Sequence, residues 1–125
     1  MARLLLVDDE RDIRHLFAAE LEDEGYQVET AASVAEAEEA LGRTPFDLMI
    51  LDVQMPGESG LQLLQRLASE RSPLPVILCT AYSSYKDDFS SWIADGYVVK
   101  SSDFSELKSE VARVLAKSNK GKDEG

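Results

Sequence analysis

The 125-residue sequence is poor in several residue types, and each shortage excludes a class of protein. The single cysteine, Cys79, has no second cysteine for an internal disulfide, so nothing indicates an oxidising compartment. Apolar runs such as Leu4–Val7 and Leu48–Leu51 are far too short to span a bilayer, and no signal-peptide cleavage pattern follows the N-terminus. We therefore expect a cytoplasmic protein with no membrane contact.

Basic residues are also scarce, with 13 lysines and arginines against 24 aspartates and glutamates and a formal net charge of −11. A domain this acidic repels phosphate backbones at long range, so we expect no direct binding to nucleic acid. Neither a G-x-G-x-x-G nor a Walker sequence occurs. Acids after the first apolar run would repel phosphate, so a free dinucleotide is excluded as a ligand.

The length and composition are those of one folded domain with its own core, since 44% of the residues are hydrophobic and 30% are charged. Residues 119–125 include no hydrophobic side chain. They predict a polar tail or a linker that follows a domain at residues 1–118.

Short apolar runs alternate with segments of helical spacing along the chain. The runs predict five strands, at Leu4–Val7, Tyr26–Thr30, Asp47–Leu51, Pro75–Cys79 and Tyr97–Val99. The first helical segment has Ile13, Leu16, Phe17 and Leu21 at helical spacing, and the second is capped by Ser33. The third is Gly60–Ala68, with Leu61, Leu64 and Leu67 on one side, and the fourth is Ser84–Ala94. The last helix starts with a capping box of Asp103 and Glu106. This order predicts an α/β fold, a doubly wound five-stranded parallel sheet with helices on both faces.

Ligands of such sheets gather at the carboxyl ends of the strands, so the residues directly after each strand matter most. The first strand is followed by Asp8-Asp9-Glu10, and the third, fourth and fifth are followed by Asp52, Thr80 and Lys100. Each pair of carboxylates about 4 Å apart costs roughly 4 kcal/mol at an effective dielectric near 20. A hard divalent cation offsets that repulsion, and Mg²⁺ fits best. Together with a hydroxyl and a lysine, such a site is typical of phosphoryl transfer.

A structural explanation exists for each acid taken alone. Asp9 or Glu10 is compatible with simple capping of the first helix. Coincidence is a poor explanation for the whole set of two aspartates, a threonine and a lysine at four strand ends.

The chain closely resembles the receiver domain of two-component response regulators, of the chemotaxis-regulator type, over nearly its whole length. The resemblance rests on Val7-Asp8-Asp9-Glu10, on Leu51-Asp52-Val53-Gln54-Met55-Pro56-Gly57 with Gly60, on Thr80-Ala81, and on Gly96-Tyr97-Val98-Val99-Lys100. It implies a flavodoxin-like (βα)5 fold and a signalling protein that catalyses only its own phosphotransfer and dephosphorylation.

The resemblance also implies roles for single residues. Asp52 would accept a phosphoryl group from the phosphohistidine of a sensor histidine kinase or a phosphotransfer protein. Asp8 and Asp9, the latter more directly, would hold Mg²⁺ together with Asp52 and the backbone carbonyl of Gln54. Thr80 would turn its hydroxyl toward the phosphoryl group, and Lys100 would pair with it.

Tyr97 matches an aromatic residue that swings inward as Thr80 moves. This switch would change the surface formed by helix 84–94, the fifth strand and the last helix, and so control a protein partner or an output domain. The sequence departs from the usual family pattern after Lys100, because Ser101 stands where a proline usually follows the lysine, commonly in a cis peptide bond. A cis or a trans bond is possible there.

Two other functions use some of the same residues. A receiver-like module that binds proteins without phosphorylation is the alternative, although all the key side chains for phosphorylation are present. A hydrolase of the haloacid-dehalogenase type is set aside, because that family has a second aspartate at the position of Gln54.

Overall fold

The computed structural model describes residues 2–53, 55, 59–81, 94–101 and 103–124, with residues 118–124 as backbone. Its elements in chain order are β1 (Arg3–Val7), α1 (Arg11–Asp23), β2 (Gln27–Ala31), α2 (Val34–Arg43), β3 (Leu48–Leu51), α3 (Gly60–Ser69), β4 (Val76–Thr80), β5 (Gly96–Val99) and α4 (Ser105–Glu124).

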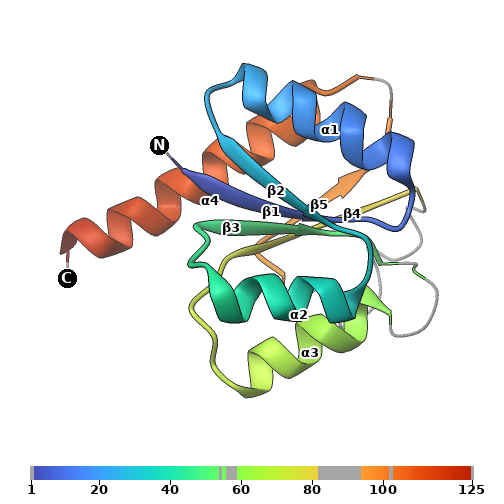
Figure 1. Ribbon diagram of the computed structural model, residues 1–125. Coiled ribbons are helices and arrows are strands. Elements are labelled where there is room, and N and C mark those ends of the chain that lie inside the picture. Colours follow the sequence, from blue (N-terminus) through green and yellow to red (C-terminus); the bar gives the residue numbers. More distant parts are fainter. Residues whose placement is uncertain (1, 54, 56–58, 82–93, 102, 125) are drawn as a thin grey trace.

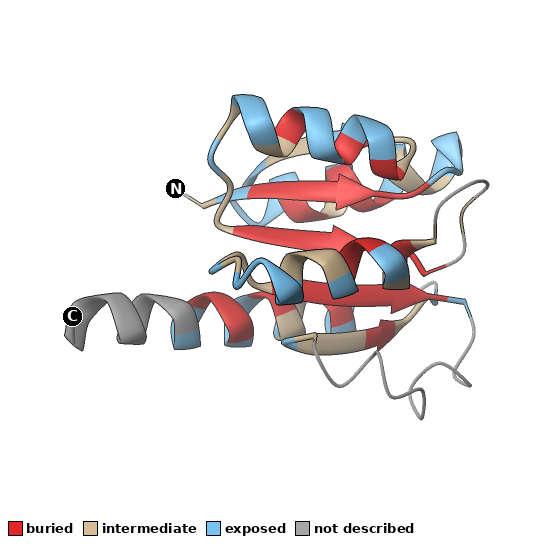
Figure 2. Ribbon diagram, turned by 90° about the horizontal axis from the view of Figure 1, so that it is seen from below, coloured by how far each residue is buried: buried red, intermediate tan, exposed pale blue. Residues whose placement is uncertain are grey.

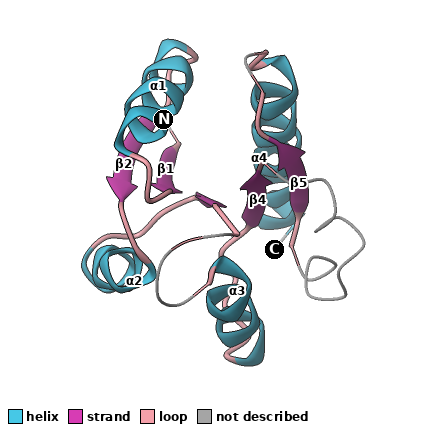
Figure 3. Ribbon diagram, turned by 90° about the vertical axis from the view of Figure 1, so that its right-hand side faces the viewer, coloured by secondary structure: helices cyan, strands magenta, loops and turns pink. Residues whose placement is uncertain are grey.

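The five strands form one parallel sheet in the order β2-β1-β3-β4-β5. Helices α1 and α4 cover one face, and α2 and α3 cover the other (Figures 1 and 3). The predicted doubly wound, flavodoxin-like sheet is therefore confirmed. Its strand order reverses between β1 and β3, the place where such sheets bind ligands.

The central strands are buried along their whole length, which explains their unbroken apolar sequence (Figure 2). Both sheet faces carry a core of their own. The core under α1 and α4 includes Leu4, Leu6, Ile50 and Val111, and the core over α2 and α3 includes Leu5, Met49 and Leu78. Successive strand residues thus supply opposite faces, as the pleat requires.

The helices confirm the predicted amphipathic pattern, with two differences. Leu16 of α1 is 49% exposed, whereas Phe17 and Leu21 are buried. Each residue turns the helix by about 100°, so Leu16 lies off the buried face that Phe17 defines. In α3, Leu63 and Leu64 are the buried leucines, while Leu61 and Leu67 are partly buried.

The caps differ from one helix to the next. Ser33 caps α2 as predicted, because its hydroxyl accepts a hydrogen bond from the Glu36 amide at 3.1 Å. The predicted capping box at the start of α4 is wrong. Asp103 accepts from the Ser105 amide at 2.9 Å, and the Ser101 hydroxyl, rather than the Glu106 side chain, accepts from the Asp103 amide at 3.1 Å.

The last helix also extends further than expected. It continues to Glu124, whereas the sequence predicts a polar tail from residue 119. The domain boundary at residue 118 stays a prediction. The predicted helix at Ser84–Ala94 lies outside the described residues, except for Ala94. In the described part of the chain, no helix combines the length and apolar character needed to cross a membrane.

Candidate functional site

The site lies at the carboxyl edge of the sheet, where β1 and β3 run side by side. Val7 and Leu51 are partners in the sheet, so the residues that follow them, Asp8 and Asp52, emerge next to each other. The Asp52 amide donates to the Val7 carbonyl at 2.9 Å, and the Asp8 amide donates to the carbonyl of Ala31 in β2 at 3.1 Å. These bonds extend the sheet by one residue and fix where both carboxylates begin.

Three carboxylates meet at this edge. Asp8 and Asp52 are 2% and 4% exposed, whereas Asp9 is exposed. One ligand oxygen from each lies within 4.8 Å of those of the other two. Clustered carboxylate oxygens are the ligands that hard divalent cations prefer, and two of these are held in a rigid, buried setting. The donor set therefore fits Mg²⁺, as the sequence predicts.

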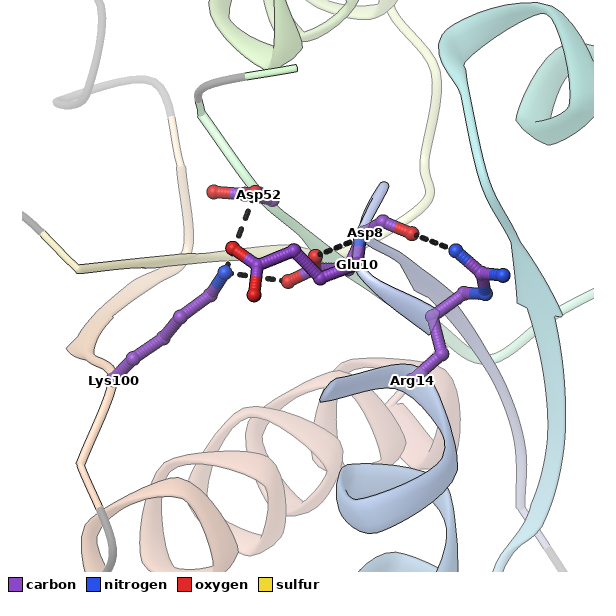
Figure 4. Close-up of polar contacts among 5 residues, drawn as sticks. All are labelled: Asp8, Glu10, Arg14, Asp52 and Lys100. Carbon is purple, nitrogen blue, oxygen red and sulfur yellow. Dashed lines mark hydrogen bonds and ion pairs between the residues drawn. The ribbon is translucent and has the colours of Figure 1, made fainter. Parts of the chain in front are cut away.

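Lys100, the first residue after β5, brings a positive charge to the two buried acids. Its ammonium lies 2.6 Å from Asp8 Oδ2 and 3.4 Å from Asp52 Oδ2 (Figure 4). Burial tends to lower the pKa of Lys100, but its hydrogen bond to Asp8 and the charges of Asp52 and Asp8 outweigh that effect and raise the pKa above its usual value. The ammonium therefore stays charged at neutral pH and offsets the repulsion between the acids.

The second Asp8 oxygen closes the turn that leads into α1. Oδ1 accepts a hydrogen bond from the Glu10 amide at 2.9 Å. Glu10 is the N-cap residue of α1, yet its side chain makes no capping hydrogen bond. The alternative in which Glu10 simply caps this helix is therefore wrong.

Gly60 explains why the Asp52 backbone can lie where it does. A Cβ atom on Gly60 would lie 2.0 Å from the Asp52 carbonyl oxygen, so only glycine allows this close approach. Ser59 and Gln62 form a capping box that starts α3 at this point. Gln54, whose backbone carbonyl is a predicted metal ligand, lies outside the described residues.

Thr80 and Tyr97 occupy neighbouring strands. Thr80 is fully buried and is the last residue of β4 rather than the first after it, and its carbonyl accepts from the Lys100 amide at 2.7 Å. Thr80 pairs with Val99, and Leu78 pairs with Tyr97. Paired residues and their i+2 neighbours share a face, so Thr80 and half-buried Tyr97 face the same side of the sheet. The peptide bond between Lys100 and Ser101 is trans, which answers the question left open by the missing proline.

The structure thus brings Asp8, Asp9, Asp52 and Lys100 together, with Thr80 joined to Lys100 through the backbone. Sequence reasoning missed Arg14, whose guanidinium Nη1 donates to the Asp8 carbonyl oxygen at 2.8 Å (Figure 4). Nothing in the sequence distinguishes Arg14 from Arg11 on the same helix, because the contact depends on how α1 packs.

The response regulator receiver domain family matches the chain over residues 4–112. The chain belongs to this family. The resemblance drawn from the strand-end motifs is therefore confirmed, and receiver domains are signalling switches.

Two curated relatives are longer than this chain. The receiver domain is 35% identical over 122 residues to the two-component response regulator PhoP of Pseudomonas aeruginosa, a match that covers 94% of this chain and 53% of PhoP. It is 39% identical over 116 residues to the alginate biosynthesis transcriptional regulatory protein AlgB of Pseudomonas putida, covering 90% of this chain and 26% of AlgB. The chain therefore spans about half the length of PhoP and about a quarter of AlgB.

Two solved structures of another response regulator are similar over most of the chain. TrrA from Thermotoga maritima, in complex with Mg²⁺-BeF, is 46% identical with a TM-score of 0.87, covering 91% of this chain and 99% of TrrA. TrrA in complex with the histidine kinase ThkA is 47% identical with a TM-score of 0.86, covering 92% of this chain and 99% of TrrA.

Proposed function

We propose that this receiver domain is a phosphorylation-activated switch in which Asp52 accepts the phosphoryl group. The observation that carries the proposal is the juxtaposition of the Asp52 carboxylate with a lysine ammonium at 3.4 Å and with two further carboxylates. This combination of nucleophile, cation site and ammonium suits phosphoryl transfer. The complex of TrrA with Mg²⁺-BeF supports the same assignment.

The proposed donor is the phosphohistidine of a sensor histidine kinase or a phosphotransfer protein. A carboxylate oxygen of Asp52 attacks the phosphorus, and the bond between phosphorus and the imidazole nitrogen breaks. The imidazole leaves with the electron pair, and Asp52 becomes an acyl phosphate. The complex between TrrA and the histidine kinase ThkA supports a partner of this class.

Asp8, Asp9 and Asp52 are the proposed protein ligands of Mg²⁺, with the backbone carbonyl of Gln54 as a fourth. When bound, Mg²⁺ supplies positive charge that neutralises the carboxylates and the incoming phosphoryl oxygens. Asp8 and Asp52 are buried, so the chain holds their oxygens in place before any cation arrives.

Lys100 and Thr80 are proposed to stabilise the phosphorylated state. The Lys100 ammonium already lies next to the Asp52 carboxylate, so an anionic group on that oxygen gains a charge-assisted contact without a large movement. The Lys100 amide donates a hydrogen bond to the carbonyl of Thr80, and this bond holds the backbone of Thr80 next to that of Lys100.

The output is proposed to pass from Thr80 to Tyr97 along their shared sheet face. Tyr97 packs against the core over α2 and α3, so an inward or outward rotation of its ring would change the surface near β5. The surface that changes comprises residues 84–94, β5 and α4, and its target is a protein partner or an output domain. Phosphorylation shifts the populations of two such conformations.

Three further properties belong to this proposal. The domain itself makes no direct contact with nucleic acid, because its formal net charge is −11. A cytoplasmic location fits the single cysteine, Cys79, which is a free and buried thiol. The catalytic activity of the domain is limited to its own phosphotransfer and dephosphorylation.

The proposal is tested by incubating the protein with acetyl phosphate and measuring intact mass, with Mg²⁺ or with EDTA. We expect the phosphorylated species in wild type with Mg²⁺, none with EDTA, and none in Asp52→Asn. Asp12→Asn removes an exposed carboxyl of the first turn of α1 and is the matched control, which should be phosphorylated like wild type. A folded wild-type protein that takes up no phosphoryl group would contradict the proposal and favour the phosphorylation-independent binding module.

A further inference from the structure

Arg14 reaches back from α1 to the turn that carries the first two acids. Its Nη1 donates to the backbone carbonyl oxygen of Asp8 at 2.8 Å, in partly buried surroundings (Figure 4). The bond spans six residues and therefore does not belong to the regular hydrogen bonding of the helix.

This bond completes the anchoring of Asp8. The amide of Asp8 donates to Ala31, Oδ1 accepts from the Glu10 amide, and Oδ2 pairs with Lys100. Arg14 takes the remaining polar group, the carbonyl oxygen. Each polar group of Asp8 is thus bound by a different part of the chain.

The carbonyl of Asp8 belongs to the peptide that links Asp8 to Asp9. Because a peptide unit is planar, holding its oxygen also fixes the Asp9 amide and the Asp9 Cα atom. Arg14 thereby sets the point from which the Asp9 side chain starts, although it does not touch that side chain in any described contact.

Asp9 needs such indirect support. It is exposed, and among the described residues its carboxylate has neither a hydrogen bond nor an ion pair. Its oxygen nevertheless lies within 4.8 Å of oxygens from Asp8 and Asp52, which repel it. Without a rigid backbone, that repulsion would turn Asp9 away from the cluster.

We propose that Arg14 is a positioning residue for the cation site, which holds the Asp8–Asp9 peptide so that Asp9 points toward the other two carboxylates. The inference rests on the proposed function, since Mg²⁺ is the cation assigned there. Mutation of a residue that orients a metal ligand without touching the metal commonly weakens metal affinity by 10-fold or more.

The test is Mg²⁺ affinity measured by isothermal titration calorimetry in wild type, Arg14→Met, Arg14→Lys and Arg11→Met. We expect Arg14→Met to weaken the affinity about 10-fold. Arg14→Lys keeps the positive charge and a nitrogen that can donate to the Asp8 carbonyl, so its Mg²⁺ affinity should stay within about threefold of wild type. Arg11→Met removes the same charge from an exposed position on the same helix and should stay within about twofold.

Circular dichroism and urea denaturation show whether each variant is folded, and Arg14→Gln replaces Arg14→Met if the latter is not. Phosphorylation by acetyl phosphate at saturating Mg²⁺ should return to the wild-type rate in Arg14→Met, which a general loss of structure would not allow. Equal affinities of wild type and Arg14→Met, or equal losses in Arg14→Met and Arg11→Met, would overturn the inference. A wild-type protein that binds no Mg²⁺ would instead overturn the proposed function.

Discussion

At the scale of single residues, the site holds two negatively charged carboxylates in a buried place, where one ammonium offsets their repulsion. Asp8 and Asp52 are almost fully buried, and two carboxylates about 4 Å apart repel by roughly 4 kcal/mol at an effective dielectric near 20. Lys100 offsets this repulsion, because its ammonium contacts both acids and its side chain is 12% exposed. The lysine therefore contributes to stability as well as to the proposed chemistry.

We expect Lys100→Met to lower the free energy of unfolding by about 3 kcal/mol in metal-free buffer, because the variant removes the positive charge that offsets the repulsion between two buried acids. The pKa of Lys100 is raised above its ordinary value of 10.5. The difference between wild type and variant should therefore be constant from neutral pH to about 10.5 and shrink as the pH rises through the higher pKa of the folded state. Urea denaturation at a series of pH values measures the loss of free energy and its dependence on pH.

Lys108→Met is the matched control for this prediction. Lys108 also contacts two acids, Glu20 at 2.9 Å and Glu24 at 3.6 Å, but in a more exposed setting. Its loss should cost much less, because solvent screens exposed ion pairs. Equal losses in the two variants would show that burial of the Lys100 cluster adds nothing.

At the scale of elements, the junction between β3 and α3 decides where the Asp52 backbone lies. The Gly60 amide donates to the Val53 carbonyl at 3.0 Å, and the capping box of Ser59 and Gln62 begins α3 immediately there. The N-terminus of α3 consequently packs against the carbonyl of Asp52, and the missing side chain of Gly60 is what permits it.

We expect Gly60→Ala to destabilise the protein by about 2 kcal/mol, because a Cβ atom 2.0 Å from the Asp52 carbonyl forces the backbone apart. The shift should also slow phosphorylation of Asp52 at saturating Mg²⁺. Urea denaturation and the acetyl phosphate assay measure the two effects.

Gly42→Ala provides the comparison, since a Cβ atom on Gly42 of α2 would meet no atom within 4 Å beyond its chain neighbours and the backbone of its own helix. It should leave phosphorylation unchanged and raise the stability by up to about 1 kcal/mol, because alanine favours helix. If Gly60→Ala matched Gly42→Ala in both assays, the close approach would have no consequence.

At the scale of the whole molecule, one sheet with a core on each face accounts for the domain. Helix α4 closes the face shared with α1, where the Phe17 and Phe104 rings meet edge to face with centroids 5.3 Å apart. Its buried residues in the described part end at Leu115, although the helix continues to Glu124. The remaining length adds no buried side chain that the structure describes.

A chain that ends after Ser118 should therefore keep its free energy of unfolding within about 0.5 kcal/mol of the full chain. A chain that ends after Arg113 loses buried Val114 and Leu115 and should be less stable by about 3 kcal/mol or more. Urea denaturation of the three proteins tests the domain boundary predicted at residue 118. A large loss in the longer truncated chain would place the boundary further along α4.

The order of the five strands and of the helices that the structure describes could be predicted from the sequence, because buried strands and amphipathic helices leave apolar periods that depend on nearby residues alone. The same local pattern identified the candidate site residues Asp8, Asp9, Asp52, Thr80 and Lys100, since each follows or ends a strand. A parallel sheet brings the carboxyl ends of its strands to one edge, whatever the details of side-chain packing. Their assigned roles stay predictions.

Other features required the three-dimensional packing. The bond from Arg14 to Asp8, the closeness of Gly60 to Asp52 and the exposure of Leu16 depend on how a helix is rotated and placed against the sheet. The start of α4 depends on whether Ser101 or Glu106 reaches the Asp103 amide. A one-dimensional pattern specifies which face of an element is apolar, but the angle and depth at which that face docks follow from all its neighbours at once.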